Sequence, residues 1–169
     1  MQISSKFTIG VHIVAVIDFL GDSEKVTSGV LAGSIGVNPV IVRNVMGDLK
    51  EAGIIQISQG RSGIRLARPV DDITFYDIYE AVGCVKDEGM FHFHEHPNPD
   101  CPVGRNIHKA MDERLDRVQR RMEDELRGIC VADVMADIRR ELLADGQGSS
   151  AAFDFDVHGT GASPSFARS

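Results

Sequence analysis

Arginine, asparagine and lysine side chains gather between residues 38 and 65. Arginine can form two hydrogen bonds with a guanine edge and asparagine can do the same with adenine, whereas lysine neutralises phosphate without reading sequence. The candidate DNA contacts, which include one lysine near the N-terminus, are Lys6, Asn38, Pro39, Val40, Arg43, Asn44, Lys50, Gln59, Arg61, Ser62 and Arg65. The alternative is an ordinary solvated surface, so the elements that carry these residues decide between the two interpretations.

The three cysteines, Cys84, Cys101 and Cys130, are too few and too widely spaced for a disulfide framework, so we expect reduced thiols. Cys101 precedes Pro102 at the predicted start of a long helix. Free N–H groups and the positive end of the helix dipole lower the pKa of a thiol at such a position. Cys101 is therefore a candidate redox or electrophile sensor, and the alternative is a half-buried structural cysteine.

Histidines alternate just before that helix, at His92, His94 and His96, and His108 follows within it. Together with Cys101 they could in principle bind zinc, but their spacing matches no standard metal motif. We therefore predict no metal site, and expect the histidines to cap, pack or respond to pH. The sequence also holds no glycine-rich phosphate loop, nucleophile elbow or His-Glu-x-x-His motif, which argues against an enzyme.

The elements that must position the candidate DNA contacts form a helix-turn-helix pattern. The apolar run at 7–20 predicts a buried helix, and Thr27 or Ser28 can cap a short second helix that ends at the turn of Gly36. Asn38 and Pro39 then favour a new helix start, and we expect this third helix to run to about residue 51. Its predicted core face is Ile41, Val42, Val45, Met46 and Leu49, and its opposite face is Val40, Arg43, Asn44 and Gly47.

A hairpin and a fourth helix complete the predicted DNA-binding domain. Strand-like segments at 54–58 and 64–67 flank a polar turn that contains two glycines, which is typical of the wing of a winged helix. Thr74 and Asp77 match a capping box at the start of a helix over 74–82, which we expect to lean back on the first helix.

A long helix over 103–129 carries an apolar stripe that needs a partner. The stripe follows an eleven-residue repeat, which keeps it on one face of a nearly straight helix, while the opposite face is charged. We predict that two copies pack antiparallel along it, with Ile107, Met111, Leu115, Val118, Met122 and Leu126 as the dimer interface. An amphipathic helix over 131–143 is predicted to cradle that pair through Val134, Met135, Ile138 and Leu142.

The formal net charge of −7 is unevenly distributed. Residues 1–68 carry seven Lys/Arg against five Asp/Glu, a net +2, and the remaining residues carry a net −9. DNA must therefore meet the N-terminal part, because phosphates are repelled by a surface rich in carboxylates. No apolar window is long enough for a membrane span and no signal peptide is visible, so we expect a cytoplasmic protein with no membrane partner.

The predicted fold class is mostly α with a small β-hairpin. It comprises a winged helix-turn-helix domain at 1–82, a loop at 83–102, dimerisation helices at 103–144, and a tail at 145–169 that is rich in Gly, Ser and Ala and expected to be disordered.

Several segments together resemble the Rrf2 family of transcriptional repressors. They are residues 1–7, the helix-turn-helix, residues 49–55, the wing glycines Gly60 and Gly63, and residues 66–69 and 72–82. The resemblance implies a dimeric winged-helix regulator whose helix from Asn38 enters the major groove while the wing touches the minor groove. One departure is Gln59, which stands where many members carry arginine before the first wing glycine, although Arg61 could replace it.

The iron-sulfur members of that family hold their cluster with three closely spaced cysteines in the loop before the long helix. Here that loop offers Cys101, with Cys84 upstream and Cys130 beyond the helix, so we expect no iron-sulfur cluster and no other cofactor. The segment 98–104 resembles the cluster-free subgroup of the family.

Two functional hypotheses follow. The first is a homodimeric repressor that binds double-stranded DNA at a short pseudo-palindromic operator, with recognition helices about 34 Å apart and activity tuned around Cys101. The alternative is a protein-interaction module of the same fold that has lost operator binding, which the negative total charge and Gln59 favour.

Overall fold

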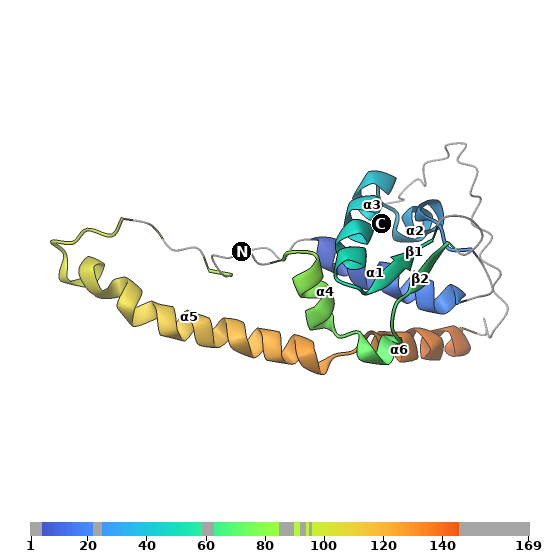
Figure 1. Cartoon of the computed structure of the whole chain (residues 1–169). Helices are drawn as coiled ribbons and strands as arrows, with labels where there is room; N and C mark the ends of the chain where they lie inside the picture. The colour runs from blue at the N-terminus through green and yellow to red at the C-terminus, as the bar shows by residue number, and fades with distance from the viewer. Residues whose placement is uncertain are drawn as a thin grey trace, which may run out of the picture.

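The computed structural model of the chain describes residues 5–21, 25–58, 63–84, 90–91, 94 and 96–145. Its elements are α1 (Ser5–Leu20), α2 (Ser28–Ile35), α3 (Pro39–Glu51), β1 (Ile55–Ile57), β2 (Ile64–Leu66), the 3-10 helix η1 (Val70–Asp72), α4 (Phe75–Ala81), α5 (Pro102–Gly128) and α6 (Val131–Ala144). Figure 1 shows α1 to α4, the hairpin and α6 gathered in one body, from which α5 extends as a rod. The predicted fold class, mostly α with a small hairpin, is confirmed.

Helix α1 is the centre of the hydrophobic core. Ile13 and Val14 are fully buried, and α2, α3, α4 and α6 all pack against the helix. Because α1 is covered from several sides, its sequence is apolar almost throughout instead of in one stripe.

Side-chain caps set the start of three helices as the sequence predicts. The Thr27 hydroxyl accepts the N–H of Val30 at 3.2 Å at the start of α2, and the Asn38 side chain accepts the N–H of Val40 at 2.8 Å at the start of α3. Thr74 and Asp77 form a reciprocal capping box at the start of α4. Each cap satisfies N–H groups that the helix itself cannot.

The hairpin is docked on the segment that precedes α2. Strands β1 and β2 pair antiparallel, with Gln56 opposite Arg65. The N–H of Ile64 donates to the carbonyl of Val26 at 3.1 Å, and the N–H of Ser58 donates to the carbonyl of Gly63 at 2.9 Å. The wing tip, with the predicted contacts Gln59, Arg61 and Ser62, lies outside the described residues.

The prediction that Ile41 faces the core is wrong, because its side chain is 43% exposed. The buried residues of α3 are Val42, Val45, Met46 and Leu49. At about 100° per residue, Ile41 lies about 90° from the centre of that stripe. It is also in the first turn of the helix, at the edge of the core.

The role predicted for α6 is also wrong in part. Val131 and Met135 are fully buried, and α6 packs on α1 and η1 of its own chain instead of being free to cradle two copies of α5. Helix α6 returns to the body because the chain reverses direction between α5 and α6. Two backbone hydrogen bonds tie this turn to the start of α4: the N–H of Phe75 donates to the carbonyl of Ile129, and the N–H of Val131 donates to the carbonyl of Ile73, both at 2.9 Å. Val134 and Leu142 are half-buried and Ile138 is 37% exposed.

No single helix in the described part of the chain is long and apolar enough to cross a membrane. The pair α2 and α3 reaches that length and composition together, but it is bent by 113°.

Replacing Gly63 with alanine should destabilise the protein. Gly63 has φ +65°, and a Cβ there would lie 2.7 Å from the carbonyl oxygen of Val26. We expect Gly63→Ala to lower the free energy of unfolding by about 1–3 kcal/mol in urea denaturation. The matched control is Gly47→Ala in α3, where a Cβ meets nothing within 4 Å. That change should stabilise by about 0.5–1 kcal/mol. Equal effects of the two substitutions would contradict the docking of the hairpin.

Candidate nucleic-acid interface

Helices α2 and α3 have the geometry of a helix-turn-helix. The bend between them is 113°, within the range of about 90–120° for this motif. Gly36 makes the turn with φ 72°, and its N–H donates to the carbonyl of Ala32 at 2.9 Å. The second helix of such a pair is the one presented to a DNA groove, and here it is α3.

One face of α3 is exposed along its whole length. Val40 is 52% exposed, and Arg43, Asn44 and Gly47 are exposed beside it. Gly47 adds no side chain, so a ligand can approach the helix backbone closely there. The structure therefore brings these four predicted residues together on one surface.

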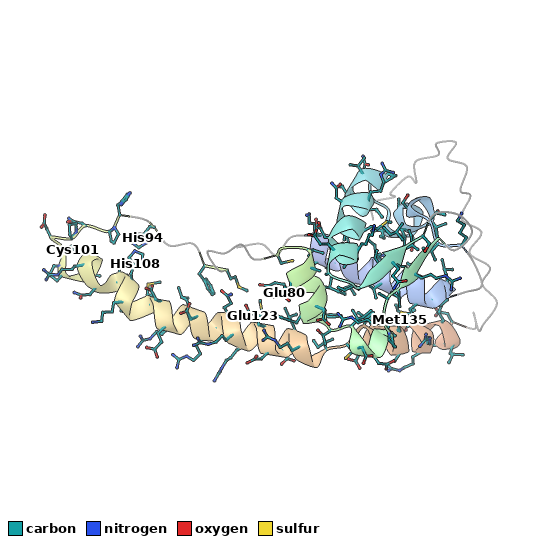
Figure 2. All side chains as sticks on the ribbon, in the orientation of Figure 1. Glu80, His94, Cys101, His108, Glu123 and Met135 are labelled. Carbon is teal, nitrogen blue, oxygen red and sulfur yellow. The ribbon has the colours of Figure 1, made fainter. Side chains whose placement is uncertain are left out.

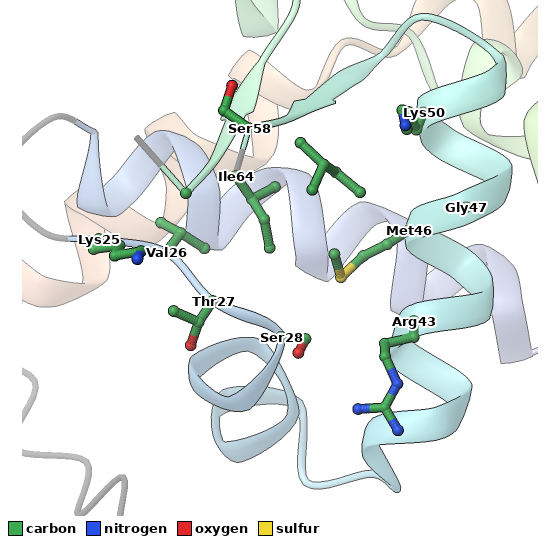
Figure 3. A pocket seen from close by; sticks show the side chains of 12 residues that line it. Lys25, Val26, Thr27, Ser28, Arg43, Met46, Gly47, Lys50, Ser58 and Ile64 are labelled. Carbon is green, nitrogen blue, oxygen red and sulfur yellow. The ribbon is translucent and has the colours of Figure 1, made fainter. Parts of the chain in front are cut away.

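An open groove of about 560 Å³ lies between α3, the start of α2 and the hairpin. Figure 3 shows Arg43 and Lys25 on opposite sides of it, with Lys50 further along α3. Its lining residues are Lys25, Val26, Thr27, Ser28, Arg43, Met46, Gly47, Lys50, Ile57, Ser58, Gly63 and Ile64. Three of these are basic, and none of the described residues that line the groove carries a carboxylate. Such a groove favours phosphate.

Lys25 is a candidate contact that sequence reasoning missed. It lies in a polar stretch next to acidic residues, and this pattern predicts only a solvent-exposed loop. The pairing of Val26 with Ile64 brings this segment beside the hairpin and so places Lys25 on the groove. That pairing is a tertiary contact with no local signal in the sequence.

The structure also describes four other predicted contacts, Lys6, Asn38, Pro39 and Arg65. The Lys6 ammonium forms an ion pair with Asp48 at 3.0 Å, which ties α1 to α3. The Asn38 side-chain oxygen is engaged in the cap of α3, Pro39 is exposed in the first turn, and Arg65 is exposed on β2.

At the far end of α5, Cys101 is exposed and occupies the N-cap position. The backbone N–H groups of Gly104 and Val103 lower the pKa of the Cys101 thiol, although no capping hydrogen bond of standard geometry forms. Cys84, by contrast, is half-buried, and burial raises the pKa of its thiol against the opposing effect of Lys6. Cys101 is therefore the more reactive thiol and Cys84 the less reactive one.

The described histidines of the loop hold it against α5. The rings of His94 and His108 lie 5.1 Å apart, and Nε2 of His108 is 3.1 Å from the carbonyl oxygen of His94. His96 is exposed, and His92 lies outside the described residues. Within the described residues no group of three His, Cys, Asp or Glu side chains is placed to hold a metal ion.

No residue of the predicted dimer stripe is buried in the single chain. All 27 residues of α5 are described and none is buried. Met111 is 37% and Val118 52% exposed, and Ile107, Leu115, Met122 and Leu126 are half-buried.

The bent helix pair, the exposed polar face of α3 and the adjacent hairpin define a winged helix-turn-helix protein. Residues 3–137 match the family model of Rrf2, described as an iron-dependent transcriptional regulator. The chain belongs to the Rrf2 family, and it is a transcriptional regulator, not an enzyme.

The relatives agree with this assignment. The chain is 40% identical to YwnA of Bacillus subtilis (strain 168), which is named as an HTH-type transcriptional regulator. The alignment spans 134 residues, which are 79% of this chain and 97% of YwnA. A crystal structure of a protein described as DNA-binding matches with TM-score 0.61 and 33% identity over 77% of this chain and 98% of that one. The B. subtilis cysteine regulator CymR shares the fold, with TM-score 0.60 and 16% identity over 80% and 97% of the two chains.

The thiols do not fit an iron-sulfur cluster within one chain. Such clusters are held mainly by cysteine thiolates that lie close together. Cys101 and Cys130 flank the two ends of α5, whose 27 residues span about 40 Å. Cys84 follows α4, near the end of α5 that is remote from Cys101.

Cys101 should be alkylated faster than Cys84. At about pH 7, below the ordinary thiol pKa of about 8.5, the lowered pKa of Cys101 leaves more reactive thiolate, while burial keeps Cys84 protonated. Mass spectrometry of iodoacetamide-treated protein over a pH series measures both rates. The Cys101 rate should still be high at pH values where a free cysteine has become slow. In Cys101→Ser the fast phase should vanish. Equal rates for the two thiols would refute this account of the loop.

Proposed function

We propose that this Rrf2-family chain is a homodimeric repressor that binds operator DNA through α3 and the hairpin. The observation that carries the proposal is the exposed face of α3 beside a basic groove whose described lining has no carboxylate. The net charge of −7 by itself favours an interaction module that does not bind DNA. The local surface of α3 and the groove is basic, however, and this is the surface that DNA would meet.

The side chains in and beside the groove would make two kinds of contact, with base edges and with phosphates. Arg43 and Asn44 stand in the first half of α3, the part of a recognition helix that reaches base edges. Lys25 and Lys50 lie where they can neutralise phosphates, which position the protein without specifying sequence. The first turn of α2, capped by Thr27, also lines the groove, and its N–H groups favour a phosphate oxygen.

Dimerisation through α5 is the second part of the proposal. Helix α5 packs on α4 and on described residues of the preceding loop, yet none of its residues is buried, and Met111 and Val118 of its apolar stripe are exposed. A second copy would cover the stripe through a symmetric contact. Two recognition helices would then face DNA, which suits a pseudo-palindromic operator. Repression follows if the bound dimer blocks the promoter.

The third part is control by Cys101 without an iron-sulfur cluster. Addition of the thiolate to a Michael acceptor forms an S–C bond while the C=C π bond of the acceptor breaks. The carbanion that results takes a proton from water, which leaves as hydroxide. The adduct would sit at the N-cap position of α5, next to the place where the helix backbone at Gly104 packs closely against Asn98 of the loop. A bulky group there would disturb the packing of the loop against the dimer helix.

Replacing Arg43 or Lys50 with alanine should weaken DNA binding in different ways. We expect Arg43→Ala to cost about 1–3 kcal/mol on the preferred sequence and to relax specificity. Lys50→Ala should weaken all sequences alike and lower the salt slope of binding by about 1. Fluorescence anisotropy at several salt concentrations measures both. The control is Lys109→Ala on α5. Binding that is unaffected by either substitution in α3 would support the interaction-module alternative.

Replacing Val118 with aspartate should break the dimer. A carboxylate in the middle of the apolar stripe would be buried unpaired in the interface, and we expect the dimer to dissociate at least about tenfold more readily. Sedimentation equilibrium measures the change. The matched control, Arg120→Asp, puts the same carboxylate on the opposite, exposed face of α5 and should leave the dimer intact. A monomeric unaltered chain, or equal effects of both variants, would contradict the proposed interface.

A further inference from the structure

Exposed apolar side chains of the DNA-binding body gather beside the basic groove. Among the described residues that precede α5, the large apolar side chains that are exposed are Val40, Ile41 and Ile57. Val40 and Ile41 stand in the first turn of α3, and Ile57 of β1 lines the groove. Single exposed apolar residues are common on protein surfaces, but all three of these lie on the two elements that border the groove. This surface therefore suits a ligand that carries apolar as well as anionic groups.

Val40 lies at the centre of the exposed face of α3. The buried residues of the helix are Val42, Val45, Met46 and Leu49. At about 100° per residue, Val40 points about 170° away from the middle of that buried stripe, and its side chain is 52% exposed. Gly47, seven residues further on, falls on the same line of the helix and adds no side chain. Val40 is therefore the side chain on this line that would meet the floor of a groove.

The first turn of α3 holds Val40 in a fixed position. The side-chain oxygen of Asn38 accepts the N–H of Val40 at 2.8 Å, which fixes the backbone there. A β-branched residue in a helix has one strongly preferred χ1 rotamer, so the two methyl groups of Val40 point in a defined direction and lose little entropy on contact. The N-terminal residues of a recognition helix are the ones that reach base edges in the major groove.

The base edges of unmodified DNA present one apolar group in the major groove, the C5 methyl of thymine. Asn44 is exposed one turn further along α3, on the same face as Val40. An asparagine amide can form two hydrogen bonds with the N6 and N7 edge of adenine. A branched apolar side chain and an amide at this spacing therefore favour an A·T base pair, which offers both groups.

We propose that Val40 reads a thymine in each half-site of the operator by van der Waals contact with its C5 methyl group, beside an adenine edge that Asn44 can bind. This contact rests on the proposed function, since it requires duplex DNA on α3. Cytosine at the same position would present an N4 donor and no methyl group. Val40 would therefore select thymine at one position of each half-site, whereas the lysines of the groove select none.

Deoxyuridine removes the methyl group of thymine and leaves its pairing with adenine intact. Duplexes that the purified full chain enriches from a random library are resynthesised with deoxyuridine at each thymine in turn, in both half-sites together, and binding is measured by fluorescence anisotropy. One symmetric pair of positions should weaken binding of the dimer about 15-fold, and the other thymines less than about twofold. Cys101 lies at the end of α5 that is remote from α3 (Figure 2), so reductant keeps its thiol in one state without affecting the Val40 contact.

Two variants of α3 assign the effect to one side chain. In Val40→Ala the cost of deoxyuridine should fall below about twofold, and this variant should fold at least as well, because alanine favours a helix more than valine does. The matched control Ile41→Ala removes a side chain of the same turn that is 43% exposed and points about 100° away from Val40. It should keep the cost of about 15-fold.

The outcomes separate the thymine contact from operator binding itself. Enriched duplexes that tolerate deoxyuridine at every position, or an undiminished cost of deoxyuridine in Val40→Ala, would overturn the thymine contact and leave the proposed function standing. Failure of the chain to enrich any duplex would overturn both.

Discussion

The burial of α1 is the constraint on which the rest of the structure depends. Four helices pack on this one apolar segment, so the direction of the recognition helix α3, the position of α4 and the return path of α6 are all set against the same surface. The Lys6–Asp48 ion pair at the N-terminal end of α1 adds a polar tie to α3. A surface ion pair contributes little free energy, so the apolar packing, which orders the whole body, dominates.

A second constraint follows from α5. This helix extends from its junction with α4 and carries the apolar stripe along its length, with the candidate thiol at its N-cap. A dimer contact along the stripe and a modification at Cys101 would both act on the same helix. In this account, DNA binding is tuned by where α5 holds the two bodies, because α3 contains no cysteine or histidine that could respond to a signal.

Local chemistry made much of this fold predictable from sequence. The caps at Thr27, Asn38 and Thr74 and the turn at Gly36 act within a few residues, so the helix-turn-helix followed directly. Features set by tertiary contact did not follow. Ile41 has the spacing of a core residue but lies at the edge of the core. Met135 is buried in the core of its own chain, where α6 packs on α1. Lys25 lies on the groove because the neighbouring Val26 pairs with Ile64 of the hairpin. The packing of α4 against α5 likewise depends on a tertiary contact that no local pattern reveals.

The central claim is that two copies of the α3 surface, joined through α5, bind a two-fold symmetric DNA sequence. The most direct test is selection of binding sites by the purified chain from a random duplex library at moderate salt. The account predicts that the enriched sequences share an inverted repeat, with both half-sites on one face of the duplex. Failure to enrich any sequence over the starting library, or enrichment of a single unrepeated half-site, would contradict it.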